Sequence, residues 1–545
     1  MSTLVTNQAL PMARSLDRLI TQWLRQLKIP VAKAFIKEKI LSHPDYPSLL
    51  SITDALDDIG IENAALVVDK EKLHEIPTPF IAHTGTRGGE FLLVHDMRKH
   101  LNKNPEFEKN WDGTVVIAEK PERWKNEKNK KYVSEEKRNR AFRWLTVSII
   151  ILFAGVSLSN QFSWQNLGLY ITALLGLAVS VLIVQHDLGI SNEITEQFCG
   201  AGVNTDCDAV MKSKGSKFLR WFNWADAGII YFSSVFILLT VSFLAGTTQS
   251  FISILSLLAT CSLPFTLFSV YYQWRVVKKW CPLCLAVVMV LWLQFLLLIP
   301  DILQISMQNV QALGILRVAF IITINVILWL QFLKPSLQKN KELTDKNYLL
   351  LRFKNNPDIF KALLQQQRRV DITPFENDLQ LGNPDADLQI MVACNPYCGP
   401  CAKAHEVLHE LVENNDIGLT IRIAVKTDNK DDMKLQAVEY ILQLLNNTGI
   451  KYKRKVLNNW YAWMSLEKFN EKYPMPEDVD VNEQLKMHER WTKESGIEFT
   501  PTVFINGYEL PKQYKREDLV LIIRKIEKKE SESNFILDEN NLVSV

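Results

Sequence analysis

Two long stretches without a charged side chain constrain this chain more than any other feature. No Asp, Glu, Lys or Arg occurs in Trp144–Gln185 or in Ala227–Trp274. About 20 apolar residues cross the hydrocarbon core of a bilayer, so each stretch is long enough for two spans. Polar breaks near Ser159–Asn166 and Gly246–Ser250 divide the two stretches. We therefore predict two membrane-spanning helical hairpins.

Two further apolar stretches raise the predicted number of spans to six. They are Trp280–Pro300 and Val318–Leu333, the latter extended backwards past Arg317. The predicted domains are a soluble α/β domain at 1–125, a charged linker at 126–143, a membrane region at 144–333, a second soluble domain at 345–530 and a polar tail at 531–545. The net charge of +2 does not indicate the strongly basic surface that is typical of nucleic-acid binding, so nucleic acid is not an expected partner.

The first soluble domain shows a helical pattern followed by strand-like runs. Helices are expected at 16–27, 31–41 and 48–59, and strands at 64–68, 79–83, 91–94 and 114–117.

The placement of the eight cysteines indicates chemistry rather than a disulfide-stapled fold. None occurs in the first 198 residues, and the cysteines are Cys199, Cys207, Cys261, Cys281, Cys284, Cys394, Cys398 and Cys401. Such clusters are typical of redox pairs or metal sites. Counting six spans puts the loop pair, the Cys281 pair and both soluble domains on the same side of the membrane. Cys261 stands alone within an apolar span, where a structural role is expected.

The segment Cys394-Asn-Pro-Tyr-Cys398-Gly-Pro-Cys401 lies between a predicted strand and a predicted helix. The partial positive charge of a helix N-terminus stabilises a thiolate, so we expect a lowered pKa for Cys398. Cys398 would attack a partner disulfide, and Cys401 would resolve the mixed disulfide. Cys394 is expected to be a free or auxiliary thiol.

A zinc site is the alternative for these sulfurs, with His405 and His409 as further candidates. Such a site needs four ligands that converge on one point. The Gly-Pro between the cysteines favours redox chemistry, and the two histidines are expected on the helix surface. We therefore predict no metal.

With the later segment Phe499-Thr500-Pro501-Thr502, residues 345–530 resemble the thioredoxin superfamily, in its periplasmic disulfide oxidoreductase branch. The resemblance implies that Thr500–Pro501 is a cis peptide facing the C-x-x-C. It also implies that residues 431–494 form an inserted helical subdomain.

The order of a loop cysteine pair, a helical hairpin and then Trp280-Cys281-Pro-Leu-Cys284 resembles the vitamin K epoxide reductase family over about 165–333. The resemblance implies a four-helix membrane core with Cys281–Cys284 beside a quinone, either ubiquinone or menaquinone. It implies that Cys199–Cys207 is the shuttle pair and that Ser213 lies near the quinone. The additional span at 144–160 departs from the family pattern.

We also expect that aromatic and leucine residues around 280–300 stack on the quinone ring. The basic residues Arg275, Lys278 and Lys279 are expected to favour a thiolate in the adjacent pair.

The N-terminal segments SHPDYPSLLSITDALDDIGI and IPTPFIAHTGTRGGEFLLVHDM resemble the peptidase C39 domain, which has a papain-like α/β fold. A cysteine peptidase needs a cysteine nucleophile and a histidine base. This region has no cysteine, and Glu90 stands where the family histidine would precede its strand. We therefore predict a non-catalytic domain.

Together these features predict a quinone-dependent membrane thiol–disulfide oxidoreductase. Electrons would pass from thiols of exported proteins or peptides to Cys398–Cys401, then to Cys199–Cys207, then to Cys281–Cys284 and the quinone. The same residues also suit the reverse direction, a disulfide reductase. Two alternative hypotheses remain. In one, the chain is an export or maturation partner that binds leader peptides through residues 1–120. In the other, it is a membrane protein that handles metal ions.

Two sequence patterns disagree about which side of the membrane the cysteines face. Lys212, Lys214, Lys217, Arg220 and the basic residues before Cys281 lie on the cysteine side, which the positive-inside rule places in the cytoplasm. Disulfide formation instead requires an oxidising compartment. We favour an inner-membrane protein with its soluble domains on the periplasmic side.

Overall fold

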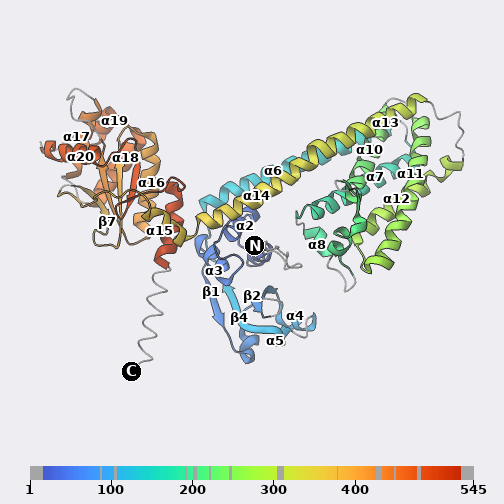
Figure 1. Cartoon of the computed structure of the whole chain (residues 1–545), viewed down its shortest axis with the longest axis horizontal. Coiled ribbons are helices and arrows are strands. Elements are labelled where there is room, and N and C mark those ends of the chain that lie inside the picture. Colours follow the sequence, from blue (N-terminus) through green and yellow to red (C-terminus); the bar gives the residue numbers. More distant parts are fainter. Residues whose placement is uncertain are drawn as a thin grey trace, which may run out of the picture. The chain divides into compact units, whose positions relative to one another are not determined.

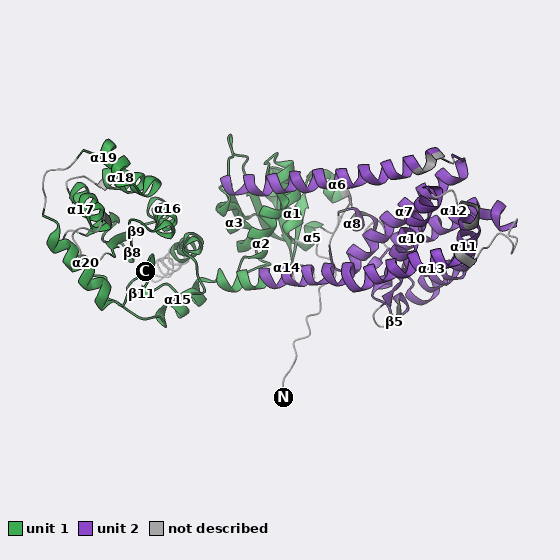
Figure 2. Cartoon of the chain, turned by 90° about the horizontal axis from the view of Figure 1, so that it is seen from above, with its two compact units in different colours: residues 1–126, 348–545 green, residues 127–347 purple. Residues whose placement is uncertain are grey.

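The computed structural model describes residues 16–85, 89–103, 107–160, 162–190, 193–199, 205–219, 222–244, 248–303, 312–376, 378–424, 433–446, 450–474 and 480–528. The predicted tail at 531–545 and the expected basic residue Arg220 lie outside these ranges. The chain divides into two compact units, which Figure 2 colours separately. Unit 2 comprises residues 127–347, and unit 1 comprises residues 1–126 with 348–545.

Unit 2 is a bundle of apolar helices (Figure 1). Its elements are α6 (Glu127–Asn160), α7 (Trp164–Asp187), α8 (Glu193–Cys199), α9 (Cys207–Met211), η3 (Lys214–Ser216), β5 (Lys217–Leu219), β6 (Phe222–Asn223), α10 (Trp224–Leu244), α11 (Thr248–Tyr271), η4 (Tyr272–Val277), α12 (Pro282–Leu303), α13 (Ala312–Ile327), η6 (Leu328–Leu333) and the start of α14 (Lys334–Lys354). Among the described residues, six helices are long and apolar enough to cross a membrane, as predicted.

The core of the bundle lies between α7, α10, α11 and α12. Close approach of α7 and α10 depends on Gly176, where a Cβ atom would lie 2.2 Å from the ring of Phe232. An ion pair joins α10 to the start of α14, since Asp226 accepts a hydrogen bond from Lys334 at 2.6 Å. The indole of Trp329 also donates to Asp226, at 2.9 Å. Ionisable groups at membrane depth are costly unless paired, and these side chains are paired.

The N-terminal part of unit 1 contains helices followed by an antiparallel sheet, in agreement with the predicted elements. They are α1 (Leu16–Gln26), α2 (Lys33–Leu41), α3 (Leu49–Asp58), β1 (Asn63–Val67), η1 (Lys70–Glu75), β2 (Phe80–Thr84), β3 (Glu90–Val94), α4 (Met97–Lys103), α5 (Phe107–Asn110) and β4 (Trp111–Ala118). The strand order is β1-β4-β2-β3. Helix α3 begins at a capping box, in which Ser48 accepts from the backbone of Ser51. The indole of Trp23 is buried and donates to the carbonyl of Pro79, which ties α1 to the sheet.

The C-terminal part of unit 1 is an α/β domain around a mixed sheet. Its elements are α15 (Pro357–Gln365), β7 (Leu379–Gly382), β8 (Leu388–Cys394), α16 (Gly399–Asn414), β9 (Ile417–Ile423), α17 (Met433–Asn446), α18 (Ile450–Trp463), α19 (Leu466–Lys472), α20 (Asn482–Glu494), β10 (Thr502–Ile505), β11 (Tyr508–Glu509) and a helix at 516–528. The strand order is β11-β10-β8-β9-β7, with β8 and β9 parallel through α16. Helices α17 to α20 lie between β9 and β10 in sequence, where the inserted helical subdomain was expected.

The predicted charged linker at 126–143 is helical from residue 127 onward. Residues 127–143 belong to α6, which continues without interruption into the first span, and α14 continues the last span. In Figure 2 these two helices extend beyond the rest of unit 2. The segment 126–143 is rich in Lys, Glu and Arg and contains no Gly or Pro, so its side chains favour a helix despite their charge.

Candidate functional site

Four of the membrane cysteines converge at one end of the unit 2 bundle. Cys199 and Cys207 form a disulfide with a Cα–Cα distance of 5.5 Å. Both are buried in an apolar cluster that also contains Cys281. The backbone of Asp206 donates to the carbonyl of Trp280 at 3.0 Å, which fixes the loop pair beside the second pair.

The second pair, Cys281 and Cys284, lies at the start of α12. The backbone N–H of Cys284 donates to the sulfur of Cys281 at 3.3 Å. Of the basic residues expected to favour a thiolate here, Arg275 lies over the ring of Trp274, 4.6 Å from its centroid.

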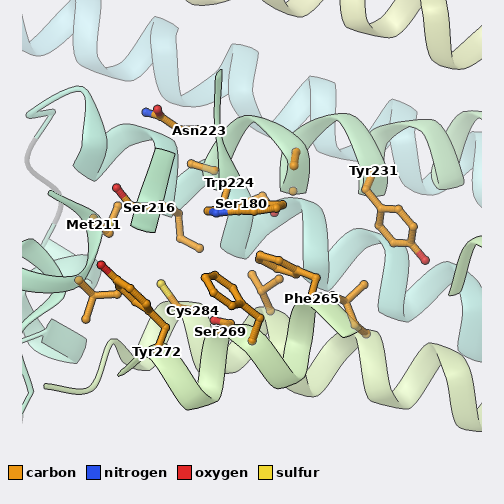
Figure 3. Close-up of a pocket in the computed structure, with 18 of the residues that line it drawn as sticks. Ser180, Met211, Ser216, Asn223, Trp224, Tyr231, Phe265, Ser269, Tyr272 and Cys284 are labelled. Atoms are coloured by element: carbon orange, nitrogen blue, oxygen red, sulfur yellow. The ribbon is translucent and has the colours of Figure 1, made fainter. Parts of the chain in front are cut away.

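Cys284 lies at the wall of an apolar cavity of about 240 Å³. Figure 3 shows its sulfur pointing into the cavity, near the ring of Tyr272. Trp224 and Phe265 supply further ring surfaces. Cys281 is absent from the described lining residues, whereas Cys284 both lines the cavity and packs against the cluster that contains Cys281 and the Cys199–Cys207 disulfide.

The aromatic lining comes from elements other than the one expected. The rings belong to α10, α11 and η4, whereas residues 280–300 contribute only Cys284, Val287 and Leu291 to the described lining. Of the aromatic and leucine residues expected at 280–300, Leu291 lines the cavity, whereas no aromatic residue of α12 is among the described lining residues.

Four of the described serines line the cavity, namely Ser180, Ser216, Ser262 and Ser269, and Ser213 is not among the lining residues. The hydroxyl of Ser213 donates to the carbonyl of Val210 at 2.6 Å. Between Ser213 and Ser216, Gly215 donates its N–H to the hydroxyl of Tyr272 and accepts from the indole of Trp224. A Cβ atom at Gly215 would lie 2.4 Å from the Tyr272 ring, so only glycine fits this position.

Gln273 connects the cavity to the cysteine pair, and sequence reasoning missed it. Its side chain is buried, lines the cavity, and accepts from the backbone N–H of Cys281 at 2.8 Å. The residue lies in the π-helical turn η4, which ends at Lys278 in the left-handed region. A turn of this kind often marks a functional site, but it leaves no simple periodic signal in sequence.

In unit 1, the C-x-x-C lies between β8 and α16. Cys398 is the N-cap residue of α16 and is half-buried, whereas Cys401 is fully buried in the first turn. The peptide bond Thr500–Pro501 is cis, as predicted. The thiol of Cys398 donates to the carbonyl of Thr500 at 3.3 Å, so this bond does face the cysteine pair.

The favoured thiolate is Cys401 rather than the expected Cys398. Hydrogen bonds from the thiols of Cys394 and Cys398, and from the backbone of Asn395, lower the pKa of Cys401 to about 6. Burial and the hydrogen bond to Cys401 raise the pKa of Cys398. The deeper sulfur collects the donors, which outweighs the position of Cys398 at the helix N-terminus.

His405 and His409 are buried, contrary to the expectation of a surface position. Their Nε2 atoms lie 2.8 Å apart on α16. Burial, with the charges of neighbouring groups, lowers the pKa of His405 to about 3 and that of His409 to about 4, so both are neutral. Within the described residues, no group of three or more His, Cys, Asp or Glu side chains converges as metal ligands.

Two segments of the chain match family models. Residues 167–299 match the model described as the vitamin K epoxide reductase family. Residues 375–525 match a thioredoxin model. No curated protein matches the chain.

Solved structures with a similar fold match about a third of the chain. A periplasmic thioredoxin-like protein from Salmonella enterica serovar Typhimurium is 14% identical, with coverage of 31% of this chain and 97% of that chain and a TM-score of 0.24. BdbD from Bacillus subtilis is 12% identical, with coverage of 30% and 96% and a TM-score of 0.24. Chlamydia trachomatis DsbA is 14% identical, with coverage of 30% and 97% and a TM-score of 0.24.

Two family matches and the geometry of the cysteine pairs indicate the activity of the chain. A domain of the vitamin K epoxide reductase family and a thioredoxin-like domain occur in one chain with six apolar helices. The chain is a multi-pass membrane disulfide oxidoreductase.

Proposed function

We propose that the chain is a quinone-dependent thiol oxidase that supports disulfide formation in exported proteins or peptides. The Cys398–Cys401 disulfide oxidises two substrate thiols and becomes a dithiol. The Cys199–Cys207 disulfide then oxidises that dithiol, and the Cys281–Cys284 disulfide in turn oxidises Cys199 and Cys207. Each exchange moves two electrons and two protons and needs direct contact between sulfurs.

One observation carries this proposal. Cys284 lies at the wall of the apolar cavity, while Cys281 is buried with the Cys199–Cys207 disulfide. One pair of cysteines therefore contacts both the neighbouring disulfide and the cavity. Exchange at Cys281 followed by oxidation at Cys284 requires no large rearrangement of α12.

The cavity lining suits a quinone ring. Trp224, Phe265 and Tyr272 offer flat apolar surfaces, and Ser216 and Asn223 add polar groups that can orient a carbonyl oxygen. A quinone bound there would accept the two electrons and two protons that leave the Cys281–Cys284 dithiol. Gln273 would hold the Cys281 backbone in place during this step.

A quinol-production assay with a reduced dithiol peptide tests the proposal. The purified wild type should reduce added quinone, and Cys281→Ala and Cys284→Ala should abolish turnover. Cys261→Ala is the matched control, because Cys261 is an exposed cysteine of a spanning helix with no partner sulfur in the two clusters described above. Absence of quinol in the wild type contradicts the proposal, and reduction of a disulfide peptide by added quinol supports the reverse direction.

We further propose that the soluble domains lie on the periplasmic side, where thiols of exported proteins are oxidised. For the N-terminal domain we propose a peptidase C39-like origin without peptidase activity. Residues 1–198 contain no cysteine nucleophile, and Glu90 opens β3 where the family histidine would stand.

A further inference from the structure

A third thiol contacts the C-x-x-C of unit 1. Cys394 is the last residue of β8 and is 4% exposed. Its thiol and that of Cys401 are joined by a hydrogen bond. The backbone N–H of the next residue, Asn395, lies 3.5 Å from the sulfur of Cys401. Cys401 therefore has one cysteine on its exposed side, Cys398, and a second on its buried side, Cys394.

The inserted helices hold this third thiol in place. The hydroxyl of Tyr461, on α18, hydrogen-bonds to Cys394. The neighbouring Trp460 donates its indole N–H to the carbonyl of Pro396, inside the loop between Cys394 and Cys398. The subdomain thus contacts both Cys394 and the loop that carries Cys398. A merely apolar core cysteine would not have these directed polar partners.

We propose that Cys394 is a third redox-active thiol, which exchanges with Cys398 for the disulfide to Cys401. The proposal rests on the redox role proposed above for Cys398 and Cys401. The sulfur of Cys394 attacks Cys401 in the Cys398–Cys401 disulfide. The Cys394–Cys401 bond forms, the Cys398–Cys401 bond breaks, and the proton of Cys394 ends on Cys398. The exchange is redox-neutral and needs no further reactant.

The consequence is a second oxidised state with different chemistry. In it the oxidising equivalent is stored in a buried disulfide, and the half-exposed Cys398 is a free thiol at the helix N-terminus. A free thiol can attack a disulfide in a bound substrate, which the Cys398–Cys401 disulfide cannot do. We infer that the domain can thereby rearrange substrate disulfides as well as form them.

Differential alkylation of the purified full chain tests the exchange. The protein is oxidised with glutathione disulfide, treated in its native state with N-ethylmaleimide, and digested with trypsin. No Lys or Arg occurs between Arg369 and Lys403, so Cys394, Cys398 and Cys401 share one peptide separate from the membrane cysteines. We expect alkylation at Cys398 in the oxidised wild type and its fall to background in Cys394→Ala.

A second variant keeps the test independent of core packing. Cys398→Ser changes only a half-buried N-cap residue, and serine is itself a good N-cap. After the same oxidation, the tryptic peptide of this variant should be lighter by two hydrogens, because Cys394 and Cys401 form a disulfide. Neither cysteine should then react with N-ethylmaleimide when the protein is denatured. If both thiols remain free in Cys398→Ser, and Cys398 is never alkylated in the oxidised wild type, the exchange is overturned.

Quinol production by the same preparation separates this inference from the proposed relay. If the wild type forms the Cys394–Cys401 bond but makes no quinol, the proposed exchange is supported and the proposed relay is contradicted. If the wild type makes quinol without any Cys394–Cys401 bond, the relay is supported and the exchange is contradicted. Cys261→Ala should behave as the wild type in both measurements.

Discussion

Hydrogen-bond donors around the sulfur of Cys401 determine the charge of the reduced thioredoxin-like site. The thiol of Cys394 and the backbone N–H of Asn395 donate to Cys401, whose pKa lies at about 6. We expect the thiolate absorbance of the reduced protein, measured as the difference from Cys401→Ser, to titrate with a midpoint near that value. In Cys394→Ala the midpoint should rise, because the first of these donors is lost. An unchanged midpoint would show that Cys394 does not donate to Cys401.

The sign of the pH dependence follows from the same contacts. A thiol whose pKa is lower in the folded than in the unfolded protein stabilises the folded reduced state above its ordinary pKa. That stabilisation is lost as the pH falls through about 6. The reduced domain should therefore become less stable relative to the oxidised domain below that pH, as measured by urea midpoints of the two forms.

Sequence predicted the residues of a contiguous motif better than their environments. The C-x-x-C was predictable because a short local pattern carries it, whereas the cis bond before Pro501 was implied by the resemblance to the thioredoxin superfamily. The thiolate position was not predictable, since the largest cause of the lowered pKa of Cys401 is its contact with Cys394 at the end of β8. His405 was placed on the surface for the same reason: its helix is covered by α18, and its ring packs 5.0 Å from that of Tyr461.

At the scale of elements, the cavity wall depends on the close approach of η3 and η4. Gly215→Ala would place a Cβ atom against the Tyr272 ring and displace it from the wall. We expect a rise of roughly tenfold or more in KM for quinone, about 1.4 kcal/mol in binding, with disulfide exchange between unit 1 and peptide unchanged. Gly155→Ala in α6 is the control, because no atom lies within 4 Å of its added Cβ. Equal KM values in the two variants would exclude this role for Gly215.

A buried ion pair anchors β9 to the segment before β7. Asp378 accepts from Arg422 at 2.8 Å and contacts His488 at 3.0 Å, and all three side chains are buried. Asp378→Asn leaves the Arg422 charge without its partner, so we expect a loss of about 3–5 kcal/mol in the free energy of unfolding. Urea-dependent alkylation of the buried Cys394 measures unfolding of this domain. Glu413→Gln, which breaks an exposed pair with Arg454, should leave the midpoint unchanged.

The carboxylate of Asp378 also makes the stability of this domain depend on pH in the acidic range. Burial raises the pKa of Asp378, but hydrogen bonds from His488 and Arg422 outweigh burial and the pKa lies below its ordinary value. The stabilisation is therefore present above the ordinary carboxylate pKa and is lost as the pH falls through the lowered one. Asp378→Asn should remove this part of the acid dependence, whereas Glu413→Gln should not.

Helices and strands with a regular pattern of apolar residues were predictable from the sequence. The segments that connect them were not. The four membrane-core helices and the strands of the N-terminal sheet lie within a few residues of their predicted bounds. The charged stretch before Trp144 was taken for a linker because it is polar. Its helix-forming residues and lack of Gly or Pro make it part of α6. The η4 turn, which positions Gln273, depends on packing between α11 and α12 and has no comparable local signal.

At the scale of the whole molecule, the number of spans decides which groups share a side of the membrane. Six candidate spans predict that the chain returns to the side where it began, with both soluble regions and the loops before Cys207 and Cys281 facing one compartment. This count, rather than any single motif, makes a relay between the three cysteine pairs topologically possible. It does not identify the compartment, and the basic residues Lys212, Lys278 and Lys279 on that side favour the cytoplasm by the positive-inside rule.

A membrane-impermeant maleimide applied to intact cells distinguishes the two orientations. Cys401→Ser leaves Cys398 half-exposed and without its usual disulfide partner, which makes it the reporter. We expect Cys398 to be labelled before lysis, because long domains translocate largely regardless of loop charge and the oxidising reaction requires the periplasmic side. A Cys398→Ser, Cys401→Ser double variant gives the background from the remaining cysteines. Labelling of Cys398 only after lysis would place the whole relay in the cytoplasm, where a reductase direction becomes the better proposal.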